Sequence, residues 1–240
     1  MTYTILVAQP GLLGAATASR SLAAGNAVLA VAPHAGVTVS QAWTNRRLRG
    51  LLLGALADGE SPAAAVARVP DWDEEPELRQ VAALTPDGRG AHRTGASCTA
   101  WAGGLVAPGV VVVGNLLTGP EVLDAMLAAW TSGTGVPAQA PALEPELAEA
   151  LTETFDAPVV SPVDPALALA HRLAAALRAG EAAGGDRRGR QSAALQVART
   201  TSERIWPPQL AVDLRVDDGD RPVDELERLL ALPGASSPAA

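Results

Sequence analysis

Thr2, the second residue of the chain, could act as a nucleophile that supplies its own general base. A small residue after Met1 normally permits removal of the initiator methionine, which would leave Thr2 with a hydroxyl and a free α-amine. The pKa of an α-amine is about 7.7–8.0, so a fraction is neutral near pH 7 and can accept the hydroxyl proton. Met-Thr is also a common start, and the dipeptide alone favours an ordinary N-terminus. The strand predicted to begin at Tyr3 favours a nucleophilic role for Thr2, because a strand would hold this residue in place.

A glycine-rich loop over residues 179–192 is the second place where chemistry is expected. Asp186 is followed there by three arginines, and then by Gln191 and Ser192 at the start of an expected strand. Arginine forks could bind an anionic substrate, but cations are also favourable in an ordinary loop after a helix C-terminus. Asn115 ends another expected strand, where its amide could donate to an oxyanion or simply form a turn.

Several kinds of site are excluded by what the sequence lacks. All 18 basic residues are arginine, so lysine Schiff bases, P-loop lysines and lysine-assisted nucleophiles are absent. No G-x-S-x-G or G-x-G-x-x-G motif occurs, and we expect neither a metal nor a cofactor. The single cysteine, Cys98, excludes an internal disulfide and a metal cage of several cysteines. A Cys98/His92 nucleophile pair is conceivable, but a small buried hydrophobic role for Cys98 is favoured.

Composition and charge narrow the class of partner. Hydrophobic residues make up 48% of the 240 residues, as in an ordinary globular protein. The net charge is −8, whereas proteins that bind nucleic acid or an anionic membrane carry an excess of basic residues. The sequence therefore favours neither kind of partner. No apolar run approaches the roughly 20 residues that span a bilayer, and no secretory signal is visible. We therefore expect a cytoplasmic protein.

The elements that must position these residues form an α+β pattern. Strands are predicted at residues 3–9, 12–19, 28–32, 36–43, 80–85, 90–93, 106–113, 192–199 and 209–216. Helices are predicted at residues 47–58, 62–69, 120–131, 165–183 and 222–232. Because this order does not alternate strand and helix, it favours two antiparallel sheets between helices over a doubly wound sheet.

Caps and irregular segments complete this organisation. Ser61 is expected to cap a helix, and Thr118 with Glu121 resembles a capping box. Asp164 and Pro165 are expected to start the helix that runs to residue 183. We expect residues 1–232 to be one domain, with a proline-rich insertion at 133–165 that holds one possible helix at 145–155. Residues 233–240 are expected to be a disordered tail.

Seven blocks of the sequence, in order, resemble a bacterial family called domain of unknown function 1028, placed in the N-terminal-nucleophile (Ntn) hydrolase superfamily. The blocks are Met1–Ile5, Ala18–Arg20, Gln41–Asn45, Cys98–Gly103, Gly114–Val122, Ala179–Ala193 and Val212–Asp218. The resemblance implies a four-layer αββα sandwich like that of proteasome β subunits, with Thr2 in the nucleophile position. Superfamily members hydrolyse amide bonds through an acyl-enzyme.

The resemblance also implies the remaining site residues. Ser19, Asn45, Asn115 and Asp186 fall in the family's blocks, as candidates to polarise the amine, donate to the oxyanion or hold substrate. Arg20, Arg187, Gln191 and Ser192 are the expected substrate-binding residues. The substrate would be a small amide, with an acidic group favoured by the arginines, and self-association as a homodimer is plausible.

Two departures from the family pattern keep alternatives open. Residues 46–50 read Arg-Arg-Leu-Arg-Gly where the family has a Tyr-Gly-Pro-like turn, and the lysine near the threonine of proteasome-type enzymes is missing. Arginine stays charged and cannot act as a base. Our first hypothesis is an Ntn-type amidohydrolase, and the alternative is a non-catalytic ligand-binding or scaffold protein with the same fold. A third hypothesis is hydrolysis through Cys98.

Overall fold

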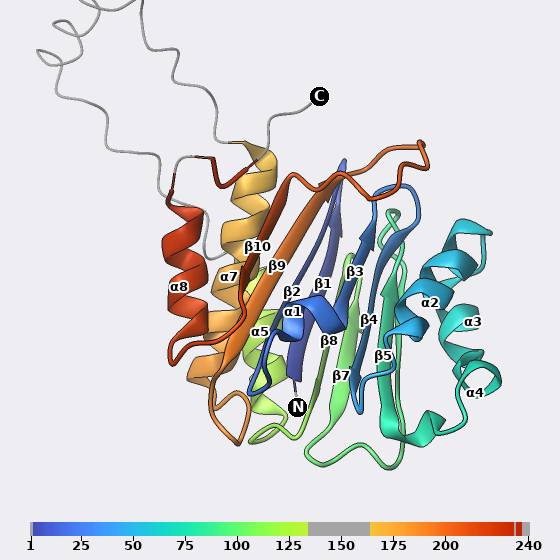
Figure 1. Ribbon diagram of the computed structural model, residues 1–240, viewed down its shortest axis with the longest axis horizontal. Helices are drawn as coiled ribbons and strands as arrows, with labels where there is room; N and C mark the ends of the chain where they lie inside the picture. Colours follow the sequence, from blue (N-terminus) through green and yellow to red (C-terminus); the bar gives the residue numbers. More distant parts are fainter. Residues whose placement is uncertain (1, 134–163, 233, 237–240) are drawn as a thin grey trace, which may run out of the picture.

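The computed structural model describes residues 2–133, 164–232 and 234–236, and two antiparallel sheets form its centre (Figure 1). The six-stranded sheet has the order β10 (Val212–Val216), β9 (Ser192–Arg199), β2 (Leu12–Ser19), β1 (Thr2–Gln9), β8 (Val110–Asn115) and β7 (Gly103–Ala107). The four-stranded sheet has the order β3 (Leu29–Ala32), β4 (Gly36–Ala42), β5 (Arg79–Leu84) and β6 (Gly90–Thr94).

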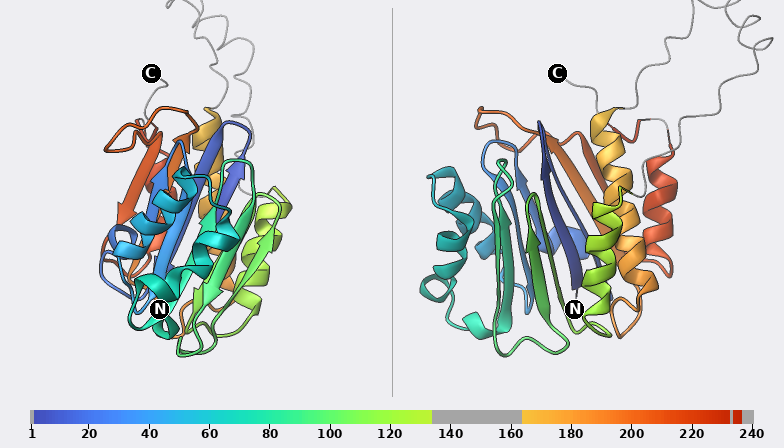
Figure 2. Two further views of the ribbon diagram at one scale, coloured as in Figure 1. Left: turned by 90° about the vertical axis from the view of Figure 1, so that its right-hand side faces the viewer. Right: turned by 180° about the vertical axis from the view of Figure 1, so that it is seen from behind.

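Helices cover the outer face of each sheet, which gives four layers (Figures 1 and 2). The six-stranded sheet is covered by α5 (Glu121–Thr131), α7 (Pro165–Ala182) and α8 (Pro222–Leu230). The four-stranded sheet is covered by α2 (Arg47–Ala57), α3 (Pro62–Ala67) and α4 (Val69–Trp72). The short elements α1 (Ala24–Val28) and η1 (Pro76–Leu78) lie in connections between strands. The predicted α+β sandwich with two antiparallel sheets between helices is confirmed.

The alternation of side chains along β1 explains which face of the sheet each one occupies. Ile5 and Val7 pack in the cluster between the six-stranded sheet and its helices, whereas Leu6 packs in the cluster between the two sheets. Strand side chains alternate between faces, so Thr2 and Thr4 face the second sheet and Tyr3 faces the helices. A third apolar cluster lies under α2 and α3.

Most predicted elements are confirmed, and the strands at 12–19 and 192–199 have the predicted bounds. The side chain of Ser61 accepts from Ala64 N, so the predicted cap is confirmed. The helix predicted to start at Asp164 and Pro165 is confirmed as well, and the side chain of Asp164 accepts from Ala166 N. Among the described residues, no helix is long and apolar enough to cross a membrane.

Three sequence predictions are wrong, and one short helix was not predicted. The single strand at 106–113 is wrong, because Gly109, with φ of 73°, turns the chain between β7 and β8. Helix α1 was not predicted. The capping box is also wrong, since Pro120 is the N-cap of α5 and makes no side-chain cap bond. The last strand begins at Val212 rather than at residue 209.

Two predicted segments lie largely outside the residues that the structure describes. The described residues include only the ends of the insertion at 133–165, so the possible helix at 145–155 lies outside them. Of the predicted tail at 233–240, only residues 234–236 are described.

Candidate active site

Thr2 begins the central strand of the larger sheet, with β2 on one side and β8 on the other. It lies opposite Asn115 in the β1–β8 register, and its Oγ1 donates to Ser19 Oγ on β2 at 3.3 Å. The residue is only 4% exposed. Three of the predicted site residues, Thr2, Ser19 and Asn115, are therefore brought together at one end of the sandwich.

Gln80, at the start of β5, anchors the polar side chains around Thr2. Its Nε2 donates to the carbonyls of Gly103 and Gly114, at 3.0 and 2.8 Å, and lies 2.9 Å from Thr94 Oγ1. Because a carbonyl can only accept, these bonds fix the orientation of the Gln80 amide and leave its Oε1 as an acceptor.

Gln80 also fixes the orientation of the side-chain amides of Gln41 and Asn115. Its Oε1 accepts from Gln41 Nε2 at 2.7 Å and from Asn115 Nδ2 at 3.0 Å. Gln41 Nε2 also lies 3.3 Å from the carbonyl of Thr2. A chain of bonds thus runs from backbone carbonyls of the larger sheet through Gln80 to the two amides nearest Thr2.

The same chain of hydrogen bonds continues from Gln41 to Thr4 and Thr17. With Nε2 of Gln41 directed at Gln80, its Oε1 accepts from Thr4 Oγ1 at 2.7 Å. Thr4 Oγ1 lies 2.7 Å from Thr17 Oγ1, which is also within 3.3 Å of the Tyr3 carbonyl. Since the Thr4 proton goes to Gln41, Thr17 is the donor to Thr4. Buried polar groups satisfied in this way hold a site rigid.

Gln41 and Gln80 are not among the predicted site residues, although the sequence pattern carries a signal for them. Gln41 and Gln80 occupy predicted strands on the same face as apolar residues such as Val39 and Ala82, which pack between the sheets. A fully buried glutamine on such a face needs partners for its amide. Alternation alone could therefore have indicated a polar cluster between the sheets.

Asp186 organises a second cluster at the same end of the larger sheet. Its carboxylate accepts from the backbone N–H groups of Arg20, at 2.7 Å, and Arg188, at 2.9 Å. It also accepts from the Arg188 guanidinium, at 3.1 Å from Nη2. Arg20 follows Ser19 directly, so Asp186 fixes the backbone next to the hydroxyl that contacts Thr2.

The other predicted residues take structural or peripheral positions. Asn45 donates to Asp73 and accepts from Arg47 N at the start of α2, so it serves that helix rather than the Thr2 cluster. Ser192 is fully buried, donates to Ser21 O at 2.6 Å and accepts from Ala24 N at 3.1 Å. Arg187 and Gln191 contact Ala100 O and Asp218 at the surface.

Cys98 does not show the features of an activated thiol. Burial raises its pKa, which disfavours the thiolate that would attack. Its Sγ lies 3.9 Å from the Glu77 carbonyl. His92 Nδ1 has no hydrogen-bond partner among the described residues, and burial lowers the pKa of His92.

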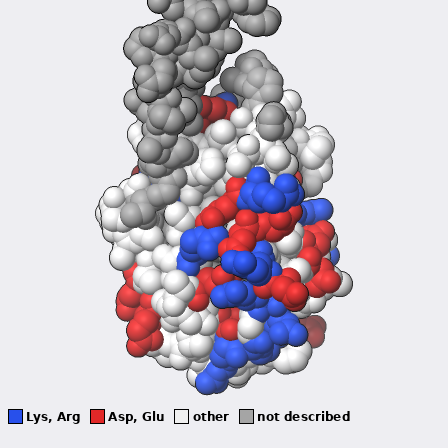
Figure 3. Space-filling model, turned by 90° about the vertical axis from the view of Figure 1, so that its left-hand side faces the viewer, with Lys and Arg blue, Asp and Glu red and all other residues white. Residues whose placement is uncertain are grey.

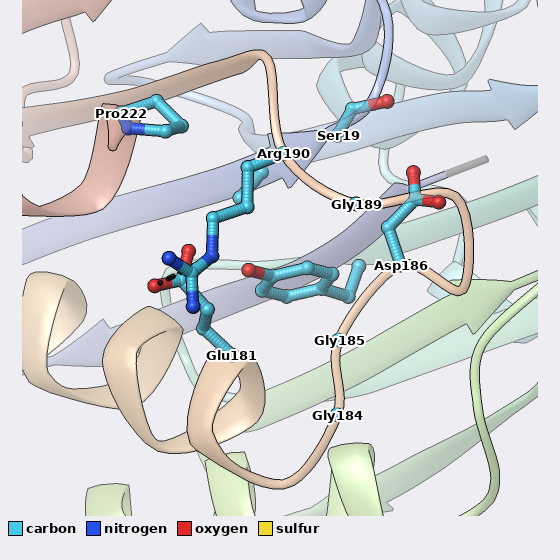
Figure 4. Close-up of a pocket in the computed structure, with 10 residues that line it drawn as sticks. Ser19, Glu181, Gly184, Gly185, Asp186, Gly189, Arg190 and Pro222 are labelled. Atoms are coloured by element: carbon cyan, nitrogen blue, oxygen red, sulfur yellow. Dashed lines mark ion pairs between the residues drawn. The ribbon is translucent and has the colours of Figure 1, made fainter. Parts of the chain in front are cut away.

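A cavity of about 210 Å³ opens beside Ser19 and Asp186 (Figure 4). Its other walls include Tyr3, Glu181 and Arg190, and Thr2 is not among the residues that line it. Among the described residues, no group of three His, Cys, Asp or Glu side chains is placed to hold a metal.

Comparison with known proteins places the chain in a family. The profile of the "Family of unknown function (DUF1028)" matches residues 2–226. The chain belongs to this family. A crystal structure of another DUF1028 protein, SPO2555 from Silicibacter pomeroyi, is 30% identical, with a TM-score of 0.71. The similarity covers 95% of this chain and 87% of that one. No curated protein matches the sequence. The family resemblance predicted from the seven sequence blocks is confirmed.

Proposed function

We propose that this DUF1028 protein is an amidohydrolase of the Ntn type, in which Thr2 becomes the nucleophile once Met1 is removed. The observation that carries the proposal is the placement of the Thr2 hydroxyl. It lies at the start of the central strand, 3.3 Å from Ser19 Oγ and opposite Asn115, among buried polar side chains. A strand end held by hydrogen bonds keeps the nucleophile in one geometry.

In the proposed reaction, the Thr2 oxygen attacks the amide carbonyl carbon while its proton passes to the α-amine of the same residue. The tetrahedral intermediate collapses, the C–N bond breaks, and the leaving nitrogen takes that proton. Water then hydrolyses the threonine ester, with the same amine as base. Ser19 holds the hydroxyl by accepting its hydrogen bond.

We assign the oxyanion donor to Asn115. Its Nδ2 carries two hydrogens, of which one goes to Gln80. The other is the donor we assign to the developing negative charge, because a fixed amide costs little reorganisation during the reaction. Gln80 and Gln41 would be positioning residues that act through Asn115 and the Thr2 backbone.

Two measurements on the purified protein test this proposal. Intact mass spectrometry should show a chain that begins at Thr2, and a retained Met1 would rule the mechanism out. A β-lactone probe should then add one acyl group to Thr2. Labelling should vanish in Thr2→Ala and persist in Thr2→Ser, which keeps the hydroxyl. Thiol alkylation at Cys98 should not reduce it.

The alternative function, non-catalytic ligand binding on the same fold, draws on two observations. Thr2 is only 4% exposed, and the chain has no lysine. This alternative predicts an inert Thr2 and a ligand affinity that Thr2→Ala leaves unchanged.

A further inference from the structure

The cavity beside the larger sheet has a construction distinct from that of the Thr2 cluster. Its walls come from β1 and β2, from the C-terminal end of α7 with the loop that follows, and from Pro222 at the start of α8. Tyr3 and Ala18 project here on the helix-facing side of the sheet, opposite to Thr2. A volume of about 210 Å³ can hold a small organic molecule or several waters.

Glu181 contributes a buried carboxylate to this cavity. Its side chain is 11% exposed, and Oε1 lies 3.3 Å from Arg190 Nε. Its second oxygen, Oε2, is buried and has no hydrogen-bond partner among the described residues. Burial raises the pKa of Glu181, although the positive charge of Arg190 acts to lower it. A buried acceptor of this kind is costly to leave unmatched, so it calls for a donor beyond the described residues, such as a bound ligand.

Arg190 offers the complementary group. Figure 4 shows its side chain meeting that of Glu181 on one side of the cavity, while Asp186 and Ser19 lie on the other. A guanidinium has five N–H donors, and the ion pair with Glu181 uses Nε. The Arg190 side chain is 48% exposed, so its terminal nitrogens can reach a ligand carboxylate.

Tyr3 supplies a neutral hydroxyl on the same wall. It is 3% exposed, and burial raises the pKa of its phenol, helped by the negative charges of Glu181 and Asp186. The hydroxyl therefore keeps its proton and can donate. The Tyr3 ring, Ala18 and Pro222 give the cavity an apolar part.

The charges around the cavity are balanced. The Asp186 carboxylate is already bound by Arg20 and Arg188, which leaves Glu181 and Arg190 as the charged pair that can meet a ligand. Figure 3 shows acidic and basic side chains interspersed over the middle of one face of the molecule. A ligand that carries one positive and one negative group matches this lining better than a simple anion or cation.

We propose that this cavity binds a small zwitterion of the α-amino-acid class. Its ammonium group would donate to Glu181 Oε2, its carboxylate would accept from Arg190, and its side chain would lie against the Tyr3 ring and Pro222. This proposal does not depend on the nucleophilic role of Thr2.

Calorimetric titration of the purified chain with each common L-amino acid, added alone, tests the proposal. At least one should bind at the millimolar level or tighter, with one site per chain. Its N-acetyl and carboxamide derivatives, which lack one charge each, should bind roughly tenfold more weakly or worse. Glu181→Gln and Arg190→Gln should weaken binding by a similar factor. Glu225→Gln removes a comparable carboxylate from an exposed pair with Arg228 and should bind normally.

Three results would overturn the proposal: no amino acid binds, the singly charged derivatives bind equally well, or folded Glu181→Gln and Arg190→Gln proteins keep full affinity. Thermal melting establishes that each variant is folded. Binding by Thr2→Ala should equal that of the unaltered protein. A failure of amide hydrolysis would therefore leave this result intact, and the converse also holds.

Discussion

Asn115 Nδ2 donates to Gln80 Oε1 at 3.0 Å, a bond that joins the two sheets directly beside Thr2. The bond fixes which end of the Asn115 amide carries hydrogen, because Gln80 is itself oriented by two backbone carbonyls. The donor that we assign to the oxyanion is thus set by a residue from the opposite sheet. The contact therefore links the packing between the sheets to the amide that we propose as the oxyanion donor.

Gln80→Leu should destabilise the protein strongly. Leucine fits a similar volume, but it removes the partners of Gln41, Asn115, Thr94 and two carbonyls at a fully buried position. We expect the free energy of unfolding to fall by about 3 kcal/mol or more, as measured by urea denaturation.

Gln196→Ala is the matched control for that substitution. Gln196 is half-buried and donates to Asp213 at the surface, so its loss should cost about 0.5 kcal/mol or less. Equal losses in the two variants would show that the buried network adds no stability.

Asp73→Asn should destabilise the protein at neutral pH, and the difference should vanish in acid. Burial alone would raise the pKa of Asp73, but hydrogen bonds from Arg79, Asn45 and Glu75 N together lower it from the ordinary 3.8 to about 2. Because the folded pKa is the lower one, the ionised form stabilises the fold above about pH 4. This contribution is lost as the pH falls toward 2.

Urea midpoints of the wild type and Asp73→Asn between pH 7 and pH 2 measure this effect. The two curves should converge as the pH falls. A gap that stays constant with pH would mean that the charge of Asp73 has no part in the difference.

Asp186→Asn should loosen the loop that holds Ser19 in place. Asparagine keeps the size of the side chain but loses the charge that attracts Arg188 and replaces one acceptor oxygen with a donor. We expect faster amide hydrogen exchange over residues 186–190 and at Arg20, with unchanged exchange in α2. If the loop exchanges at the wild-type rate, the carboxylate is not what holds it.

The alternation of apolar residues made much of the fold predictable. Strands such as β2 and β9 are short, continuous and bounded by turn residues, so local pattern and tertiary structure agree. The β7–β8 turn was not predicted, because Pro108 and Gly109 lie within a run rich in valine. That run resembles one buried strand when only local composition is considered.

The candidate site was predictable only where its residues carried their own chemical signal. Thr2 and Asp186 stand out by position and surroundings, whereas Gln41 and Gln80 act through each other across 39 residues of sequence. Asn45 lies in one of the sequence blocks that resemble the family. Its partner, however, is Asp73 from the segment after α4, and this contact holds Asn45 at the start of α2. Such long-range partners follow from sheet register, which the sequence leaves open.

Two glycine substitutions should have opposite effects on stability. A Cβ at Gly25, in α1, would lie 2.2 Å from Ala194 Cβ on β9, so Gly25→Ala must push apart two packed elements. A Cβ at Gly54, on the exposed face of α2, would meet no atom within 4 Å. Alanine is the better helix former by about 1 kcal/mol, so Gly54→Ala should raise the melting temperature.

Thermal melting of the two single variants beside the wild type checks this pair. Gly25→Ala should lose about 1–3 kcal/mol through overpacking, a loss that helix propensity in a five-residue helix cannot offset. Both substitutions add the same methyl group within a helix, so a large difference between them reports mainly the packing around each position. A Gly25→Ala protein as stable as Gly54→Ala would mean that α1 does not pack against β9.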